Sequence, residues 1–253
     1  LRGCDAVVNL VGILNERGHD GSGFVHAHVA LAEKLIEACR KTGVKRLLQM
    51  SALKANAERG PSHYLSSKGR AEEVIKSRAS DSIRYTIFRP SVIFGPGDSF
   101  INRFAGILRL TPVLPLPHLQ ARFAPVYVED VAEAFFLSLT DTRTFGETYE
   151  LCGPDIYTLE EILRYLCREL GLRRAIFNLP GPLGRFQAWV GEYLLPGKPF
   201  SRDNYRSLTV ASVCRDNGFR SFGIRPQRMQ TIVPTYLTQK IDELAEIRQA
   251  SRR

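Results

Sequence analysis

Val44-Lys-Arg-Leu-Leu-Gln-Met-Ser51, an apolar run that ends in a hydroxyl residue, predicts a strand of a parallel sheet. The segment from Ser62 to about Ser77 predicts a helix, because Ser62 can cap its first amides and the residues that follow suit a helix. Glu72 and Glu73 are expected on the solvent side of that helix. The chain therefore passes from a strand through a loop into a helix at this point.

Two further strands flank this unit. Cys4 to Gly12 is a β-branched apolar run, and Tyr85 to Phe94 is another. Between the first two strands, apolar residues recur at helical intervals from about Gly23 to Thr42, and Gly43 is the expected stop. A regular succession of strands and helices is typical of βαβ units with right-handed crossovers.

The second half of the chain is more varied. The sequence predicts, in order, a helix over 100–110, a turn or edge segment over 111–117, a short strand over 124–128, a helix over 129–139, a strand over 147–151, helices from Thr158 onward and an amphipathic helix over 226–249. We expect an α/β fold with a Rossmann-like doubly wound parallel sheet, N-terminally truncated, and a smaller, mostly helical C-terminal lobe. The expected domains are 1–155, including an excursion to the lobe over 99–124, and 156–253.

Composition limits the function classes. At 253 residues and 44% hydrophobic content the chain can bury a full core, and no apolar run approaches the roughly 18 residues of a membrane-spanning helix. Five cysteines at unequal spacings predict free thiols in a reducing compartment. We therefore expect a cytoplasmic protein. The net charge of +9 suits an anionic dinucleotide better than a specific nucleic acid, because no basic stripe is interleaved with stacking aromatics.

Three residues suggest chemistry at the strand ends, where open parallel sheets bind their ligands. Ser51 ends its strand, and Tyr64 and Lys68 lie four positions apart on one face of the next helix. A nearby cation such as Lys68 would move the pKa of the Tyr64 phenol toward neutrality and would also reach ribose hydroxyls. Ser51 would hold a substrate oxygen while hydride moves to or from a nicotinamide.

This arrangement resembles the active-site triad of the short-chain dehydrogenase/reductase superfamily. Segments 89–98, 112–117, 125–132 and 222–237 are similar to an atypical or extended branch of it. That branch contains NAD-dependent epimerase/dehydratases and bacterial relatives of the NAD(P)H-binding alpha-subcomplex accessory subunit of respiratory complex I. The resemblance runs from about residue 4 to residue 238.

The resemblance implies NAD or NADP as cofactor and a set of residues at its nicotinamide end: Gly12, Ser51, Tyr64, Lys68, Pro90 and Val92, with Ser51, Tyr64 and Lys68 catalytic. Arg89 and Asp130 also match the family pattern. For these two we expect structural roles, Arg89 pairing with a carboxylate across the sheet and Asp130 capping the helix that follows it.

The family's glycine-rich dinucleotide fingerprint is not found in the sequence. Gly21-Ser-Gly23 opens a helix after a strand, yet no acidic residue follows at the proper distance, so we interpret it as a flexible loop. We therefore expect the chain to begin partway through the fold and to belong to a longer polypeptide.

Other residues carry weaker signals. His26 and His28 face different ways on a helix, so no metal site is predicted, and His63 is expected at the surface. Trp189 is expected in the core of the lobe.

Three functional hypotheses follow. The first is an NAD(P)-dependent oxidoreductase or epimerase/dehydratase acting on a small molecule. The second is a non-catalytic NAD(P)H-binding structural or assembly subunit, peripherally associated with a respiratory complex. The third and weakest, suggested by charge alone, is a basic protein that binds RNA or a membrane surface.

Overall fold

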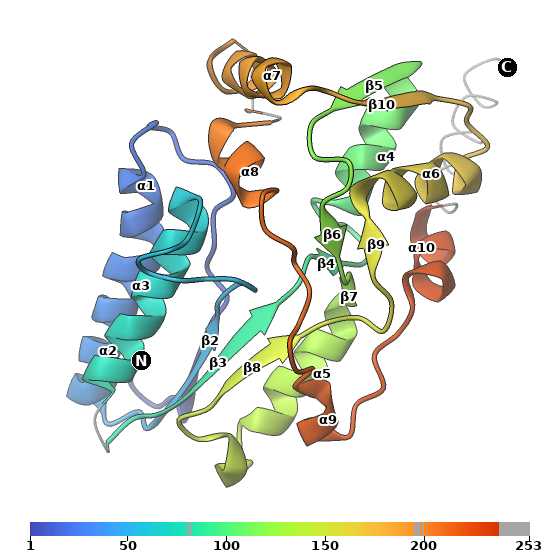
Figure 1. Cartoon of the computed structure of the whole chain (residues 1–253). Coiled ribbons are helices and arrows are strands. Elements are labelled where there is room, and N and C mark those ends of the chain that lie inside the picture. The colour runs from blue at the N-terminus through green and yellow to red at the C-terminus, as the bar shows by residue number, and fades with distance from the viewer. Residues whose placement is uncertain (80–81, 195–197, 199, 238–253) are drawn as a thin grey trace, which may run out of the picture.

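The computed structural model describes residues 1–79, 82–194, 198 and 200–237 (Figure 1). Its elements, in chain order, are β1 (Ala6–Asn9), α1 (Ser22–Phe24), the π-helical turn η1 (Val25–Ala30), α2 (Leu31–Thr42), β2 (Arg46–Met50), α3 (His63–Arg78), β3 (Arg84–Pro90), β4 (Ile93–Phe94), α4 (Ile101–Leu110), β5 (Val113–Leu116), β6 (Arg122–Phe123), β7 (Val126–Tyr127), α5 (Val128–Ser138), the 3₁₀ turn η2 (Thr142–Thr144), β8 (Thr148–Leu151), β9 (Tyr157–Thr158), α6 (Leu159–Glu169), β10 (Ala175–Asn178), α7 (Gly181–Tyr193), α8 (Arg202–Ser207), α9 (Phe219–Phe222) and α10 (Met229–Leu237).

The central sheet has four strands in the order β1-β2-β3-β8, and all its neighbouring strands run parallel. In its register Asn9 lies beside Gln49, and Met50 lies beside Phe88. The carboxyl ends of β1, β2 and β3 therefore meet at one edge. The expected α/β fold with a parallel Rossmann-like sheet is confirmed.

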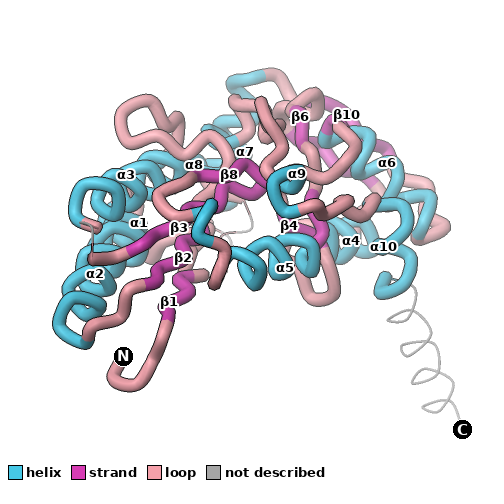
Figure 2. The backbone as a smooth tube through the Cα atoms, turned by 90° about the horizontal axis from the view of Figure 1, so that it is seen from below, coloured by secondary structure: helices cyan, strands magenta, loops and turns pink. Residues whose placement is uncertain are grey.

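Helices cover both faces of this sheet, as Figure 2 shows from below. Alternation along the strands explains the two layers, since neighbouring residues point to opposite faces. Leu47 and Ile87 join one buried cluster with residues of α2 and α3. Leu48 and Phe88 join another with residues of α5 and with Phe219 of α9.

A separate apolar core lies under the helices beyond the sheet. It joins α4, the segment from β5 to β7, α6 and α10. Two small ladders, β10 with β5 and β6 with β9, border it. A mainly helical C-terminal region is thus present, whereas α9 returns to the large sheet. The division at 155 and 156 stays a prediction.

Local differences from the sequence predictions have physical reasons. The strand expected over 85–94 is divided, because β3 ends at Pro90 and β4 pairs instead with β7. The segment expected as a turn contains β5, which pairs with β10. Gly43 ends α2 with a positive φ of 77°, as expected. The helix expected over 226–249 begins only at Met229 as α10, and residues 238–249 lie outside the described residues.

The expectation of free thiols was wrong for two of the five cysteines. Cys152, just after β8, and Cys214 form a disulfide with Cα atoms 6.0 Å apart. Their segments are held together by backbone hydrogen bonds at Ala124, which donates to Ser212 and accepts from Gly153. This proximity cannot be read from the spacing of 62 residues. Cys39 and Cys167 are free and buried, and Cys4 is free and exposed.

Two other expectations concern the surface. Among the described residues, no helix combines the length and hydropathy needed to cross a bilayer. Trp189 was expected in the core, but it is 42% exposed on α7. Its helix packs through its small residues instead, so the indole faces outward.

Candidate active site

The ends of β1 and β2 are fixed by side-chain amides. Asn9 donates from Nδ2 to Oε1 of Gln49 at 2.7 Å, and its Oδ1 accepts the amide of Val11 at 3.1 Å. The chain therefore turns at the end of β1 and exposes Gly12. A Cβ atom at Gly12 would lie 3.1 Å from Nζ of Lys68, so glycine leaves open backbone directly in front of that ammonium.

Helix α3 presents a row of functional side chains to these strand ends. Ser62 caps the helix and accepts the amide of Leu65 at 3.2 Å, as predicted. Tyr64, Lys68 and Glu72 follow at four-residue intervals and therefore share one face. The row contains one member, Glu72, that the sequence analysis placed on the opposite side.

Lys68 is the best-defined member of the row. Its side chain is 2% exposed, and Nζ donates to the backbone carbonyls of Val11 and Met50, both at 3.0 Å. An ammonium has three N–H groups, and among the described residues the third has no acceptor. Burial lowers the pKa of Lys68 to about 8, with the charge of Glu72 acting in the opposite direction. Lys68 thus joins the ends of β1 and β2 and keeps one donor free.

Ser51 directly follows Met50, whose carbonyl accepts from Lys68, but its own side chain faces a different partner. Its hydroxyl donates to Oε1 of Glu72, which is 2% exposed. Arg89 completes the cluster with two bonds to the same carboxylate, Nε to Oε1 at 2.8 Å and Nη2 to Oε2 at 2.5 Å. The expected position of Glu72 on the solvent side was wrong, because the guanidinium of β3 gives the buried carboxylate its counter-charge. The predicted carboxylate partner of Arg89 is therefore Glu72 of α3.

Tyr64 lies at the other end of the row. Its ring is half-buried and packs edge-on against His28 and Phe24, with ring centres 5.7 and 6.3 Å away. Burial raises the pKa of Tyr64 to about 12, opposite to the direction expected from a nearby cation. Its hydroxyl has no hydrogen-bond partner in the part of the chain that the structure describes. The phenol is therefore neutral at physiological pH and remains free to donate.

His28, which sequence reasoning left without a role, holds the loop after β1 against α3. Its Nε2 accepts the amide of Ile13 at 3.2 Å, and its Nδ1 lies 2.8 Å from Oγ of Ser67. Ser67 itself donates to the carbonyl of Tyr64, so Nδ1 of His28 carries the proton and donates to Ser67. Burial, together with the nearby ammonium of Lys68, lowers the pKa of His28 to about 3. The wide turn η1 directs this neutral imidazole inward, a feature without a simple sequence signal.

Not every predicted site residue joins this group. The structure brings Gly12 and Lys68 to the end of β2. Tyr64 and Ser51 lie on either side of them. Pro90 ends the neighbouring strand, where its carbonyl accepts the amide of Leu53 at 2.9 Å. Val92 packs against the apolar core under α4 and α6.

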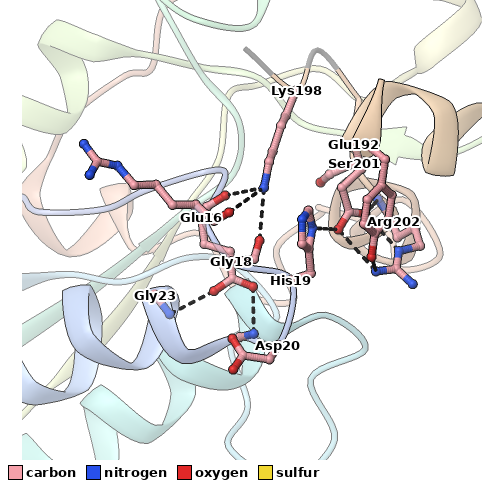
Figure 3. A network of polar contacts seen from close by, with 12 residues as sticks. Glu16, Gly18, His19, Asp20, Gly23, Glu192, Lys198, Ser201 and Arg202 are labelled. Atoms are coloured by element: carbon pink, nitrogen blue, oxygen red, sulfur yellow. Dashed lines mark hydrogen bonds and ion pairs between the residues drawn. The ribbon is translucent and has the colours of Figure 1, made fainter. Parts of the chain in front are cut away.

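A polar network ties the loop after β1 to the lobe (Figure 3). The carboxylate of Glu16 accepts the amides of Gly21 and Gly23 at 2.7 and 2.8 Å. Lys198 donates from Nζ to three consecutive carbonyls, of residues 16, 17 and 18, at 2.7 to 3.1 Å. The amides of Gly21-Ser-Gly23 thus already have an internal anion, which agrees with the argument against a phosphate cradle there.

A second link from the lobe reaches α3 directly. The carboxylate of Asp203 on α8 accepts the amides of His63 at 2.6 Å and Tyr64 at 3.1 Å. Ser207 of the same helix donates to the capping hydroxyl of Ser62 at 2.9 Å. Sequence reasoning missed Asp203 because its contact spans 140 positions. The helix that carries Tyr64 and Lys68 is therefore capped by the lobe.

Asp130 has a different role from the one expected. It lies inside the first turn of α5 instead of capping it, and its Oδ2 accepts the amide of Gln227 at 2.7 Å. Asp130 therefore anchors the segment before α10. Its carboxylate also suits the positive end of the α5 dipole.

Two surface pockets adjoin the outer end of α3, and both are partly lined by His63, which is exposed as expected. Neither is lined by Ser51, Tyr64 or Lys68, so we locate the site by its chemistry at the strand ends. Within the described residues, no group of histidine, cysteine and acidic side chains could hold a metal ion.

A model of the NAD dependent epimerase/dehydratase family matches residues 1–152, more than half of the chain. The chain belongs to this family. It is also related to subunits of respiratory complex I. It is 29% identical over 248 residues to the mitochondrial NADH dehydrogenase (ubiquinone) 1 alpha subcomplex subunit 9 of Arabidopsis thaliana, covering 93% of this chain and 60% of that protein.

Two other relatives have different names. The mitochondrial NADH-ubiquinone oxidoreductase 40 kDa subunit of Neurospora crassa is 32% identical over 71% of this chain and 46% of its own length. The ceramide reductase of Caulobacter vibrioides is 30% identical over 72% of this chain and 55% of its own length. The chain thus spans about half of the length of these relatives.

Solved structures share the fold. A nucleoside-diphosphate-sugar epimerase from Staphylococcus aureus superposes with a TM-score of 0.69 at 18% identity, covering 90% of this chain and 76% of that one. RMD from Pseudomonas aeruginosa, complexed with NADPH, gives 0.59 at 21% identity over 70% and 69% of the two chains. UDP-glucuronic acid 4-epimerase from Bacillus cereus, in complex with NAD, gives 0.60 at 18% over 70% and 62%. The description of the matched family names NAD, and two of these solved structures hold NADPH or NAD.

Proposed function

We propose that the protein binds NAD or NADP at the carboxyl ends of β1, β2 and β3 and uses it in an oxidoreductase or epimerase/dehydratase reaction. The observation that carries the proposal is the buried ammonium of Lys68, held between Val11 and Met50 with one N–H free. A cation with a free donor at the ends of parallel strands suits a dinucleotide ribose.

The residues at the strand ends fit a nicotinamide dinucleotide. Gly12 gives open backbone in front of Lys68, and the free hydroxyl of Tyr64 belongs to the same helical face. Lys68 would hold the ribose, with Gly12 and Pro90 forming the adjacent walls. Val92 remains a predicted member of the site on the side of the lobe. The bound dinucleotide would supply or accept hydride.

Tyr64 would act as the proton donor. Its pKa of about 12 keeps the phenol protonated, so it can donate to a substrate oxygen as that oxygen gains charge and can then be reprotonated from water. Ser51 would stabilise the same oxygen, which requires its hydroxyl to leave Glu72 when substrate binds. Substrate would thus compete with Glu72 for that hydroxyl.

The second candidate is a non-catalytic subunit that binds the dinucleotide beside a respiratory complex at the inner membrane. The engagement of Ser51 by Glu72 favours it, because a hydroxyl that already donates to a carboxylate is not free for a substrate oxygen. Two relatives are named as subunits of NADH dehydrogenase (ubiquinone) and of NADH-ubiquinone oxidoreductase, which supports a respiratory complex as the partner.

Two measurements on the intact protein separate these candidates. Calorimetric titration with NADH and NADPH comes first, and Lys68→Met should weaken binding about tenfold or more, because a hydrogen bond from a charged group is lost. Lys34→Met, exposed on α2, is the matched control and should bind normally. Equal binding by the Lys68 variant and the unmodified protein would refute the proposed site.

Nicotinamide absorbance is then followed with ketones, quinones and nucleotide sugars. Turnover that falls about a hundredfold in Tyr64→Phe and is unaffected in Tyr85→Phe, at the other end of the sheet, would support catalysis. Tight binding without turnover, unchanged by Tyr64→Phe, would favour the non-catalytic subunit.

A further inference from the structure

Helix α7 has an unusual distribution of side chains. The residues that it buries are mostly small, Gly184, Ala188 and Gly191, together with Glu192. Its large apolar residues point outward, and Phe186 is 63% exposed. An amphipathic helix of a globular protein normally shows the reverse arrangement. Tyr193, at the end of the helix, stacks on His19 and lies under Arg202. The rest of the outward face of α7 is an apolar surface without a partner among the described residues.

Close packing explains why α7 cannot simply rotate. A Cβ atom at Gly191 would lie 2.3 Å from the carbonyl oxygen of Phe200, and one at Gly184 would lie 2.6 Å from Cβ of Pro117. Gln187 also donates to the carbonyl of Pro115 in β5 at 2.8 Å. The glycine side must face inward, so the aromatic side is fixed outward.

Neighbouring elements extend this surface. In the β5–β10 ladder Val113 pairs with Ala175, and Pro115 pairs with Phe177, so these residues share the outer side. The inner side, with Leu114 and Leu116, belongs to the core. The exposed large apolar residues of this end, which we call the α7 surface, are Leu110, Val113, Phe177, Leu183, Phe186, Trp189, Tyr193 and Leu194. Figure 1 shows α7, β5, β10 and the end of α4 together at the top of the molecule.

The charge of the same elements has one sign. Residues 99–118 and 170–194 contain five arginines, Arg103, Arg109, Arg173, Arg174 and Arg185. Their one acidic residue, Glu192, is buried and paired with Arg202 at 2.9 Å. Arg174 donates to the carbonyl of Leu108 at 2.6 Å, which joins β10 to the end of α4. Arg173 and Arg185 are exposed, so cations lie beside the apolar and aromatic side chains of this end.

We propose that the α7 surface docks on an anionic lipid bilayer. Tryptophan, tyrosine and phenylalanine suit the boundary between headgroups and acyl chains, and arginines beside them attract anionic headgroups. A short helix that lies in the plane of the headgroups does not need to span the membrane. This inference is independent of the dinucleotide site.

The chain contains its own probe, because Trp189 is its one tryptophan. Fluorescence of the chain is recorded with phosphatidylglycerol vesicles and with phosphatidylcholine vesicles. The emission of Trp189 should shift to shorter wavelength with the anionic vesicles, less with the neutral ones, and the shift should decrease as salt rises. Unchanged emission with anionic vesicles would overturn the proposal.

Variants locate the contact by vesicle sedimentation. Phe186→Ser should weaken binding about tenfold, because a buried phenyl ring is lost. Phe136→Ser, on α5 at the opposite end of the molecule in Figure 1 and 71% exposed, is the matched control and should bind normally. Replacing the exposed Arg173 and Arg185 with glutamine should weaken binding about fivefold for each charge. An equal loss in both phenylalanine variants would refute the location.

Self-association through the same surface gives a different result. Sedimentation velocity would then show a dimer that Phe186→Ser converts to a monomer, without vesicle binding. That outcome would replace the bilayer with a second copy of the chain.

Discussion

At the scale of single residues, the site depends on buried polar groups whose charge state is fixed by their neighbours. Lys68 is held as a cation by two carbonyls, whereas His28 is held neutral by an amide donor on one nitrogen and Ser67 on the other. These two side chains lie close together, so the neutral state of His28 avoids repulsion from Lys68. Proton uptake at His28 should therefore disturb the loop that carries Gly12.

Acid should destabilise the protein through His28. Burial and the charge of Lys68 lower its pKa from about 6.5 in the unfolded chain to about 3. As the pH falls, the imidazole of His28 is protonated in the unfolded chain before it is protonated in the folded one. The free energy of unfolding is therefore highest above pH 6.5 and falls by about 1.4 kcal/mol per pH unit toward pH 3. Urea unfolding between pH 7 and pH 4 measures this slope.

His28→Gln keeps an acceptor and a donor without the titration, so it should reduce the slope. His26→Gln, exposed on the same turn, should leave it as it is. An identical pH dependence in all three proteins would contradict the assignment to His28.

At the scale of elements, α3 sets the distance between its functional row and the strand ends. Gly69 follows Lys68 directly, and a Cβ atom there would lie 2.3 Å from the backbone of Asn56 and Ala57. The missing side chain lets α3 approach the loop that follows β2. Helix and loop are thus packed backbone against backbone beside the site.

Two glycines in helices should respond oppositely to alanine. Gly69→Ala should destabilise the protein by about 1 to 3 kcal/mol, because overpacking outweighs the gain in helix propensity. Gly106→Ala in α4 has no atom within 4 Å of the new Cβ and should stabilise by up to about 1 kcal/mol. Thermal unfolding followed by circular dichroism compares them, and the same sign in both variants would contradict this packing.

At the scale of the whole molecule, the disulfide joins the end of β8 to the segment that leads from α8 to α9. It closes a loop with a separation of 62 residues that contains much of the lobe. Without reductant, a thiol assay in denaturant should detect three cysteines, and after reduction it should detect all five. Reduction should also lower the free energy of unfolding by about 4 kcal/mol through the larger unfolded ensemble. Five reactive thiols before reduction would show that the bond is not formed.

The sequence predicts the parallel sheet because strand and helix periods, Gly43 and the Ser62 cap are all local signals. It could not show that Glu72 is buried while Glu73 is exposed, since this depends on Arg89 from another strand. The four-residue spacing of Tyr64, Lys68 and Glu72 was the available clue.

Long-range geometry explains the remaining errors. The disulfide, the outward orientation of Trp189 and the cap from Asp203 each depend on segments far apart in the sequence. Local periodicity carries no information about such neighbours. The candidate site residues contributed by the end of β2 and by α3 lie near one another in sequence, so local signals were enough to group them.

The carboxylate of Asp203 also constrains protein engineering. Exchanging the lobe for that of another family member would bring a new residue to the amides of His63 and Tyr64. A chimera that lacks an acceptor there would fold with a frayed start of α3, and its specificity and its chemistry would change together. Lobe and helix are therefore best transplanted as one cassette.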